Sequence, residues 1–223
     1  MTVNFNNRLL YKENREHTAF FKLYRKIAPT FFTSFTRRLL DKKLKDLFKT
    51  YEAGVTLNIG AKINPYKIKS TVYETLDIVD TYKPTYCQDI HKTNINSNLF
   101  DTVIGIEVLE HLDNPYVAVE EIKRILKPNG IFIGSTPFVY PYHGEPHDIL
   151  RFTEYGLRQI FKDFKEVKII PHGNRLLVIL ELIFLTNKFI GLFRIFFRPL
   201  IYLKLKNSRC PLGFIIIAKV GEV

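Results

Sequence analysis

The sequence predicts an α/β fold in which a mostly parallel β-sheet carries helices on both faces. Short apolar runs alternate with segments of helical periodicity, which is typical of strand–helix–strand units. Most of these runs are almost continuously apolar, as parallel strands buried on both faces should be. The 223 residues are enough for one such domain, and no linker or internal repeat divides the chain.

The first segments with helical periodicity are basic. We predict a short helix over residues 16–27 and a longer one over residues 31–51. In the longer helix, apolar side chains recur at helical spacing and lysine or arginine fills much of the rest. Such a helix either packs on the domain or contacts a membrane or a substrate. We assign residues 1–52 to an N-terminal helical extension.

The main domain, residues 53–223, begins where the spacing of apolar residues changes from helical periodicity to short apolar runs. Strands are predicted at residues 55–59, 73–78, 85–87, 100–106, 130–135, 165–170 and 214–220. Two helices separate some of them. One covers residues 114–126 and ends at the turn Lys127-Pro128-Asn129-Gly130, and the other runs from a cap at Thr153 to about residue 161.

An apolar helical insertion, residues 174–210, precedes the last strand. Charged residues interrupt every window long enough to span a bilayer, so we expect no transmembrane helix. Aromatic and aliphatic side chains alternate there with lysine and arginine, which favours a helix or helix pair lying in a membrane interface. A lid or a dimer contact buried within protein is the alternative.

The positive charge lies in the flanks. Residues 1–52 carry twelve Lys and Arg against five Asp and Glu, residues 174–223 carry eight against two, and residues 53–173 carry thirteen against fifteen. This distribution suits an anionic partner such as a membrane surface, unless it serves solubility alone. With no secretory leader, Cys87 and Cys210 are expected to be reduced thiols in a cytoplasmic protein at the inner membrane face.

Polar residues follow several predicted strands, where a doubly wound sheet binds its ligand. Gly60 follows the first strand and lets the backbone pass close to a ligand. Asp77 lies seventeen residues later, about where an acid reaches ribose hydroxyls in nucleotide-binding folds. Asp89 and Glu107 follow the next two strands. Each position alone is also typical of ordinary turns.

The segment Phe100 to Pro137, FDTVIGIEVLEHLDNPYVAVEEIKRILKPNGIFIGSTP, is similar to class I S-adenosylmethionine-dependent methyltransferases. The resemblance rests on the Phe-Asp strand start, the Leu-Glu-His, the Asn-Pro helix start and the Leu-Lys-Pro turn, in that order. It extends over roughly residues 55–171, and the closing FIIIAKV fits the family's antiparallel seventh strand. The resemblance implies a Rossmann-like seven-stranded, mostly parallel sheet and S-adenosyl-L-methionine as the cofactor.

The resemblance also implies which residues contact the cofactor. Gly60 and its neighbours would lie against the carboxypropyl part of the cofactor. Asp77 would bind the ribose hydroxyls, and Asp89 would contact the adenine. The complete set is Asn58, Gly60, Ala61, Asp77, Ile78, Asp89, Ile90, Ile106 and Glu107.

The glycine-rich loop of that family is altered in this chain. Asn58, Lys62 and Asn64 stand where the family has an acid and two glycines, and only Gly60 is kept. Losing the acid removes a charge-assisted acceptor worth about 1.5–3 kcal/mol where such a bond is made. A non-catalytic binding protein with a degenerate cofactor pocket is therefore one alternative function.

A second distinctive segment, residues 135–161, follows the fifth strand. It resembles the pattern His-x-x-Pro-x-Asp-x-x-Arg-x-Thr of methyltransferase-like proteins associated with cell-surface polysaccharide and lipid-linked glycan synthesis. We predict His143 or His147 as the base that takes a proton from an oxygen acceptor, with Asp148 orienting one of them. Two alternatives remain open: a metal site at His143 and His147, which we do not expect on a loop, and a purely structural role. His111 either points into the site or packs.

These features predict O-methylation of a glycan or a lipid-linked intermediate. A nucleic-acid methyltransferase is the alternative that charge alone favours, although the basic residues are interleaved with aliphatic and aromatic side chains rather than set in a polar stripe. The sequence does not determine the oligomeric state.

Overall fold

The computed structural model describes residues 33–51, 54–61, 66, 68–143, 147–186, 193–202 and 210–222. The predicted helix over residues 16–27 lies outside them, as do Lys62, Asn64 and parts of the insertion.

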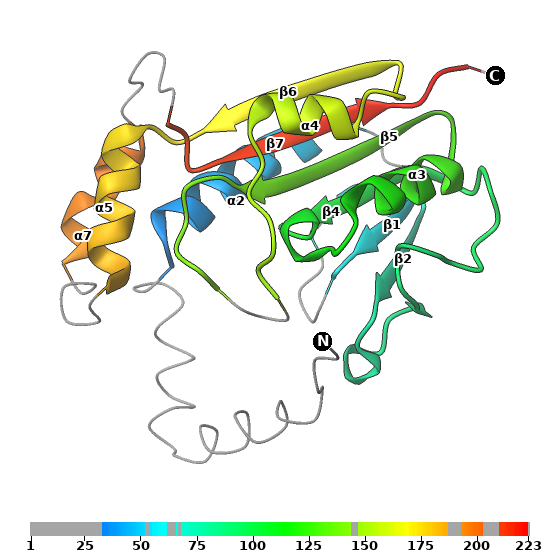
Figure 1. Cartoon of the computed structure of the whole chain (residues 1–223), viewed down its shortest axis with the longest axis horizontal. Coiled ribbons are helices and arrows are strands. Elements are labelled where there is room, and N and C mark those ends of the chain that lie inside the picture. Colours follow the sequence, from blue (N-terminus) through cyan, green and yellow to red (C-terminus); the bar gives the residue numbers. More distant parts are fainter. Residues whose placement is uncertain are drawn as a thin grey trace, which may run out of the picture.

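The described chain forms a seven-stranded sheet in the order β3-β2-β1-β4-β5-β7-β6. The strands are β1 Val55–Ile59, β2 Val72–Asp77, β3 Tyr86–Cys87, β4 Phe100–Ile106, β5 Leu126–Pro137, β6 Glu166–His172 and β7 Gly213–Lys219. Every neighbouring pair is parallel except the two that include β7, which lies antiparallel between β5 and β6. The predicted fold class, including the antiparallel last strand, is confirmed (Figure 1).

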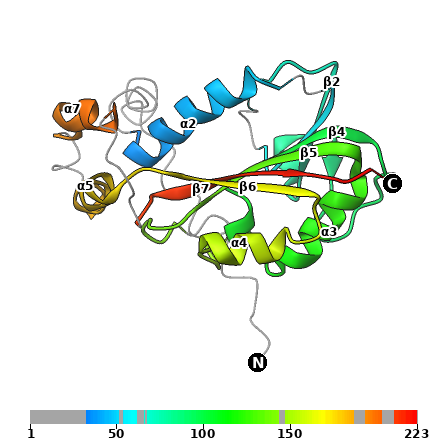
Figure 2. The ribbon, with the colours of Figure 1, turned by 90° about the horizontal axis from the view of Figure 1, so that it is seen from above.

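Helices cover both faces of this sheet (Figure 2). On one face α3 Pro115–Ile125 and α4 Glu154–Ile160 pack on alternate strand residues; this core cluster includes Leu57, Val103, Phe132 and Ile216. On the other face α2 Phe35–Phe48 packs through Leu40, Leu44 and Phe48 against the intervening residues Ile104, Ile133 and Ile215. The helix that the sequence assigns to an extension therefore covers one face of the sheet.

Each of these helices begins at a side-chain cap. Ser34 accepts a hydrogen bond from the Arg37 N–H at 3.0 Å, Asn114 accepts one from Val117 at 3.3 Å, and Thr153 accepts one from Gly156 at 3.1 Å. These contacts satisfy backbone donors that the first helical turn leaves unpaired.

The fifth strand differs from its predicted range. It begins at Leu126, directly after α3, so the residues predicted as a turn lie inside it. Asn129 has φ 62°, and the register with β4 shifts between Phe100 and Thr102. The first residues of β5, where the turn was predicted, therefore pair irregularly with β4.

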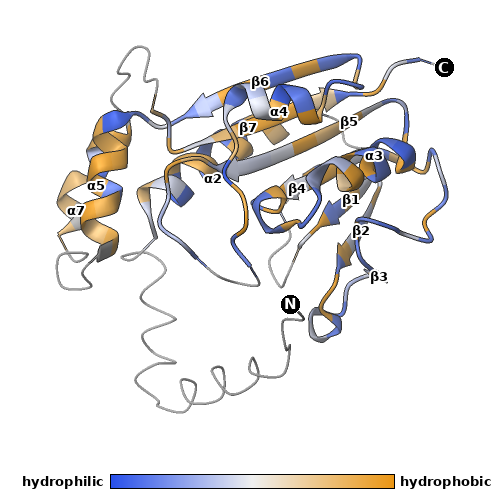
Figure 3. Cartoon of the chain, viewed as in Figure 1, coloured by the Kyte–Doolittle hydropathy of each residue, from blue (hydrophilic) through white to orange (hydrophobic). Residues whose placement is uncertain are grey.

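Two largely hydrophobic helices lie beyond the carboxyl end of the sheet (Figure 3). They are α5 Arg175–Thr186 and α7 Arg194–Phe197, followed by a 3₁₀ turn at Arg198–Tyr202. α5 contributes Leu177, Val178 and Phe184 to a core that it shares with the start of α2. Among the described residues, no helix has the length and the hydrophobicity that a membrane span requires.

Candidate active site

The carboxyl ends of β1, β2 and β3 bring together three of the predicted cofactor residues. The Gly60 N–H donates to the carbonyl of Leu76 at 2.8 Å, which places Gly60 beside Asp77. Asp77 pairs in register with Cys87, two residues before Asp89. Gly60, Asp77 and Asp89 therefore follow adjacent strands at one edge of the sheet.

Gly60 occupies a position that excludes a side chain. Its φ is +65°, a backbone conformation that residues with a Cβ rarely adopt. A Cβ at this position would lie 2.8 Å from Cγ2 of Val108. A glycine is thus required here for the close approach of the chain after β1 to the chain after β4.

Both acids of this edge are held by local hydrogen bonds. Asp77 is buried, and its Oδ1 accepts from the Val79 N–H at 2.9 Å. Asp89 Oδ1 accepts from the His91 N–H at 2.9 Å and lies 2.6 Å from Nδ1 of the same ring. Partial burial raises the pKa of Asp89, but the hydrogen bonds from His91 outweigh it and lower the pKa below the usual value.

Glu107, directly after β4, adopts a left-handed backbone conformation with φ 55°. Such a conformation is uncommon for a non-glycine residue and tends to occur at functional sites. Its Oε1 accepts from the Ser135 hydroxyl at 2.9 Å. Burial raises the pKa of the Glu107 carboxyl, although the Ser135 hydrogen bond acts in the opposite direction.

The remaining predicted cofactor residues are mostly packed into the fold. Ile90 belongs to the core beneath α3, and Ile106 belongs to the core beneath α2. Asn58 and Ala61 are buried, whereas Ile78 is exposed. Since Ile90 and Ile106 already contact the core, only Ile78 among the three isoleucine candidates has a large exposed surface.

The loop between β5 and α4 brings His143 and Asp148 together. Nδ1 of His143 lies 3.1 Å from Oδ2 of Asp148, and the same oxygen accepts from the His143 N–H at 3.1 Å. Arg151 binds both oxygens of Asp148, one of them at 2.6 Å. This bidentate contact with Arg151 lowers the pKa of Asp148 to about 2, so the carboxyl is ionised at neutral pH.

His147 enters the site through its backbone. Its carbonyl oxygen accepts a hydrogen bond from Nδ1 of His111. Glu145 lies outside the described residues.

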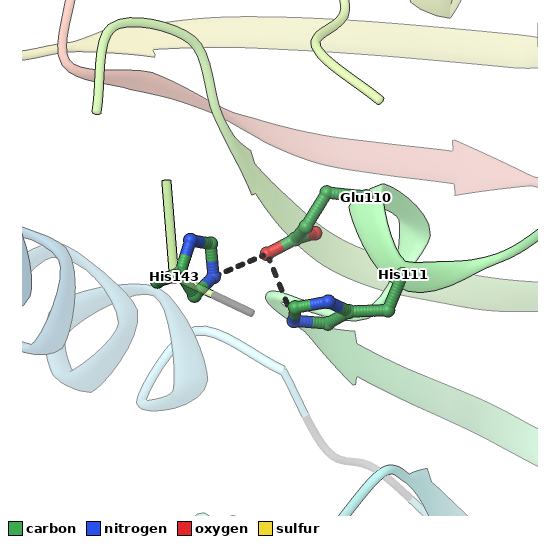
Figure 4. A group of neighbouring side chains, drawn as sticks. All are labelled: Glu110, His111 and His143. Atoms are coloured by element: carbon green, nitrogen blue, oxygen red, sulfur yellow. Dashed lines mark ion pairs between the residues drawn. The ribbon is translucent and has the colours of Figure 1, made fainter. Parts of the chain in front are cut away.

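A carboxylate and two imidazoles meet at the carboxyl end of β4 (Figure 4). Glu110 and His111 lie on the 3₁₀ turn Leu109–His111, and His143 comes from the loop after β5. Oε1 of Glu110 is 3.8 Å from Nε2 of His111 and 4.0 Å from Nε2 of His143. Each residue can offer a ligand atom to one metal ion, and these atoms all lie within 4.8 Å of one another.

Glu110 was not among the predicted site residues. Its side chain is 0% exposed, and neither carboxylate oxygen has a hydrogen-bond donor from another described residue. Burial raises the pKa of this carboxyl well above its usual value, and the nearby charge of Glu107 raises it further. The Glu-His pair within LEHL was visible in the sequence, but only the fold brings His143 onto it.

Comparisons with known proteins agree with this architecture. Residues 60–134 match the family described as a methyltransferase domain. Phosphoethanolamine N-methyltransferase 2 of Haemonchus contortus, solved with S-adenosyl-L-methionine, superposes with a TM-score of 0.55 at 15% identity, covering 82% of this chain and 52% of that chain. This chain therefore spans about half the length of that protein. A comparison with curated proteins found no match.

Two further structures are similar over most of their length. A SAM-dependent methyltransferase from Archaeoglobus fulgidus has a TM-score of 0.55 at 16% identity, with 91% of this chain and 100% of that chain covered. The [4+2]-cyclase SpnF has a TM-score of 0.52 at 14% identity, with 81% of each chain covered. At these identities the structures establish the fold, and the cyclase illustrates that the fold alone does not specify the reaction.

Proposed function

Since residues 60–134 carry a methyltransferase domain within the fold of the S-adenosylmethionine-dependent methyltransferases, we propose that this chain binds S-adenosyl-L-methionine and transfers its methyl group to a hydroxyl oxygen. The observation that carries the proposal is that the predicted cofactor positions and the histidine loop meet at one edge of the sheet. Gly60, Asp77 and Glu107 end adjacent strands there, and the loop residue His143 lies against the turn that follows Glu107.

The residues present fit this cofactor. Gly60 turns in a left-handed conformation against Val108, where a Cβ would clash, and Asp77 places a buried carboxylate at the end of β2. Carboxylates in this position accept hydrogen bonds from ribose hydroxyls. Asn58 is buried at the place of the family's acid, so this chain binds the cofactor without that charge.

When bound, the cofactor supplies a methyl group on a positively charged sulfur. Transfer to the acceptor would form an oxygen–carbon bond as the carbon–sulfur bond breaks, and the electron pair of that bond would stay on sulfur. The acceptor proton leaves to a base. His143 or His147 takes this proton, and the ionised Asp148 orients His143. Alignment of acceptor and methyl carbon supplies much of the remaining acceleration.

Calorimetry with S-adenosyl-L-methionine tests the cofactor assignment. Asp77→Ala should weaken binding at least tenfold, a loss of about 1.4 kcal/mol. Asp80→Ala is the matched control, because Asp80 is an exposed acid three residues away on the surface turn and forms an ion pair with the exposed Lys83. Absence of binding heat for the wild-type chain at millimolar cofactor would contradict the enzyme hypothesis. It would favour a non-catalytic binding protein with a degenerate cofactor pocket.

The loop histidines are tested by turnover. His143→Ala and His147→Ala should each lower kcat by about 100-fold or more, because a positioned base contributes roughly 10²–10⁴-fold. Affinity for the cofactor should stay unchanged in both. Wild-type turnover in both variants would remove the base from the proposal.

For the acceptor we propose a glycan or a lipid-linked intermediate. Its support is the resemblance of the histidine loop, together with the apolar side chains of α5 that are exposed beyond the site edge: Ile179, Leu182, Ile183 and Leu185. Such a surface suits the lipid part of an acceptor at the inner membrane face. Incubating the enzyme with labelled cofactor and measuring intact masses of candidate acceptors tests this step, and labelling of RNA or DNA alone would favour the nucleic-acid alternative.

A further inference from the structure

We propose that Glu110, His111 and His143 form a binding site for a divalent transition-metal ion beside the cofactor edge. The sequence places a potential metal site only at His143 and His147. In the structure the residues grouped with His143 are Glu110 and His111 rather than His147. The ligand set therefore comes from two elements, the turn after β4 and the loop after β5 (Figure 4).

Glu110 needs a positive partner, and among the described residues only the imidazoles of His111 and His143 face its carboxylate, at 3.8 and 4.0 Å. Its carboxyl group is fully buried, and no donor from another described residue reaches its oxygens. A buried carboxylate without a hydrogen bond or a counter-charge is strongly disfavoured. Arg151 is nearby but binds both oxygens of Asp148 instead. A proton, on Glu110 or on one of these imidazoles, or a metal ion must therefore compensate the carboxylate.

The tautomer of His111 favours a metal ion. The His147 carbonyl can only accept, so the Nδ1 that contacts it carries the proton. In neutral His111, Nε2 then presents a lone pair toward Oε1 of Glu110, 3.8 Å away. This separation is too long for a hydrogen bond through a shared proton. An ion that both atoms bind explains two facing acceptors at this distance.

The spacing of the ligand atoms is close to that of a mononuclear site. Ligand atoms about 2.1 Å from a tetrahedral ion lie about 3.4 Å apart. The separations from Oε1 of Glu110 are 3.8 and 4.0 Å, and the three ligand atoms lie within 4.8 Å of one another, so side-chain movements of about 1 Å bring them to this geometry. Two imidazoles and one carboxylate leave coordination positions open, as in catalytic sites.

The outer nitrogen of His111 is held as in metal-binding histidines, because Nδ1 donates to a backbone carbonyl. Nδ1 of His143 lies 3.1 Å from the ionised Asp148 without hydrogen-bond geometry, and the His143 backbone N–H donates to the same carboxylate at 3.1 Å. Partners of this kind fix the ring and its tautomer and direct Nε2 toward the ion. The Ile149 and Leu150 N–H groups donate to the Glu110 carbonyl at 2.9 and 3.1 Å, which holds the loop against the turn.

The role of this ion in catalysis rests on the proposed function. An acceptor hydroxyl in an open coordination position would have its pKa lowered by the ion, which eases loss of its proton. Nε2 of His143 is then a ligand, and His147 remains as the base of the loop.

Titration of the full chain with Co²⁺ tests the site without cofactor or acceptor. Chelator-treated protein should bind one Co²⁺ per chain and show the visible absorption of a low-coordinate site, and Zn²⁺ should displace it. Glu110→Gln, His111→Ala and His143→Ala should each weaken binding at least about 100-fold, since even loss of an outer partner typically costs 10–100-fold. Asp148→Asn should cost about 10–100-fold.

Two variants serve as matched controls. His147→Ala removes the neighbouring ring, and Glu120→Gln removes an exposed carboxylate on α3; both should keep wild-type affinity for Co²⁺. Glu110→Gln preserves the side-chain shape, so it keeps the test valid if a histidine variant fails to fold. Co²⁺ should raise the melting temperature of wild-type protein but not that of Glu110→Gln.

Absence of Co²⁺ and Zn²⁺ binding at millimolar metal would overturn the proposal, as would binding that the three ligand variants leave unchanged. Either result would mean that a proton, on Glu110 or on a facing imidazole, balances this carboxylate. Metal binding is measured without cofactor. The metal proposal can therefore fail while calorimetry still detects S-adenosyl-L-methionine, and the cofactor proposal can fail while the chain still binds Co²⁺.

Discussion

At the residue scale, His172 is a buried histidine at the end of β6. Its side chain is essentially inaccessible, and neither ring nitrogen has a hydrogen-bond partner in the described part of the chain. Burial, reinforced by the positive charge of Lys43, lowers the pKa of His172 to about 3. The folded protein therefore keeps this ring neutral where an unfolded chain would protonate it.

The sign of the resulting pH dependence follows from this depressed pKa. Between the unfolded value near 6.5 and about 3, the unfolded chain binds the proton and the folded chain does not, so stability falls as the pH falls. The free energy of unfolding should lose about 1.4 kcal/mol per pH unit, or roughly 2 kcal/mol between pH 6.5 and pH 5.

His172→Phe, which retains a flat ring, should remove this loss. Urea unfolding of both proteins at pH 8, 6.5 and 5 measures it, and the comparison with wild type cancels the contributions of other buried groups. A difference between the two proteins that is independent of pH would contradict the depressed pKa.

Some of the site residues could be predicted from the sequence, whereas Glu110 could not. Asp77, Asp89 and Glu107 could be predicted because each follows an apolar run, and parallel strands end at a common edge. Asp148 was predicted to orient one of the two loop histidines, and in the fold it contacts His143. Glu110 could not be predicted, since its lack of a hydrogen-bond partner depends on how the loop after β5 folds back onto the turn after β4.

At the element scale, α2 is fixed to α5 by one buried acid. Oε2 of Glu181 accepts from the Phe35 N–H at 2.9 Å, and Oε1 accepts from the Thr36 hydroxyl at 3.3 Å. A carboxylate at a helix N-terminus satisfies an unpaired donor and interacts favourably with the helix dipole. The insertion therefore stabilises the helix that covers the sheet.

Replacing Glu181 by Leu should lower the free energy of unfolding by about 1.5–3 kcal/mol, because the Phe35 N–H and the Thr36 hydroxyl lose a charged acceptor. Glu181→Gln should recover part of the loss, since its amide oxygen still accepts. Glu120→Leu, at an exposed position, should stay within about 0.5 kcal/mol of wild type. Urea denaturation measures all three, and an unchanged midpoint for Glu181→Leu would mean that α2 does not depend on this contact.

Element boundaries were predicted less well than element types. The range of β4 was predicted correctly, because its apolar run has clear ends. The start of β5 was missed, because Pro128, Asn129 and Gly130 are typical turn residues that tertiary pairing holds within an irregular strand. Helix α2 is shorter than predicted at both ends, and Ser34 is its cap.

At the scale of the whole molecule, periodicity and strand alternation were sufficient to predict the class of fold. The position of α2 over one sheet face was left open, since an amphipathic basic helix is equally suited to a membrane surface. Its apolar side faces the sheet, and the helices beyond the sheet edge carry exposed apolar side chains, among them Ile179 and Ile183.

These exposed side chains and the basic flanks together predict binding to anionic membranes. The wild-type chain should float with vesicles of phosphatidylcholine and phosphatidylglycerol, and less with phosphatidylcholine alone. Binding should weaken as salt rises from 0.1 M to 0.5 M, since the Debye length falls well below about 10 Å.

The double variant Ile179→Glu/Ile183→Glu should weaken this binding by about 100-fold or more, because each isoleucine contributes about 1.5–3 kcal/mol when it is buried. Tyr116→Glu/Val117→Glu is the matched control: it changes two exposed apolar residues on α3, at the opposite end of the molecule (Figure 2). Flotation assays and melting curves of all three proteins distinguish loss of binding from loss of folding. If the α5 variant floats as well as wild type while the α3 variant does not, the membrane-facing surface lies on α3 instead.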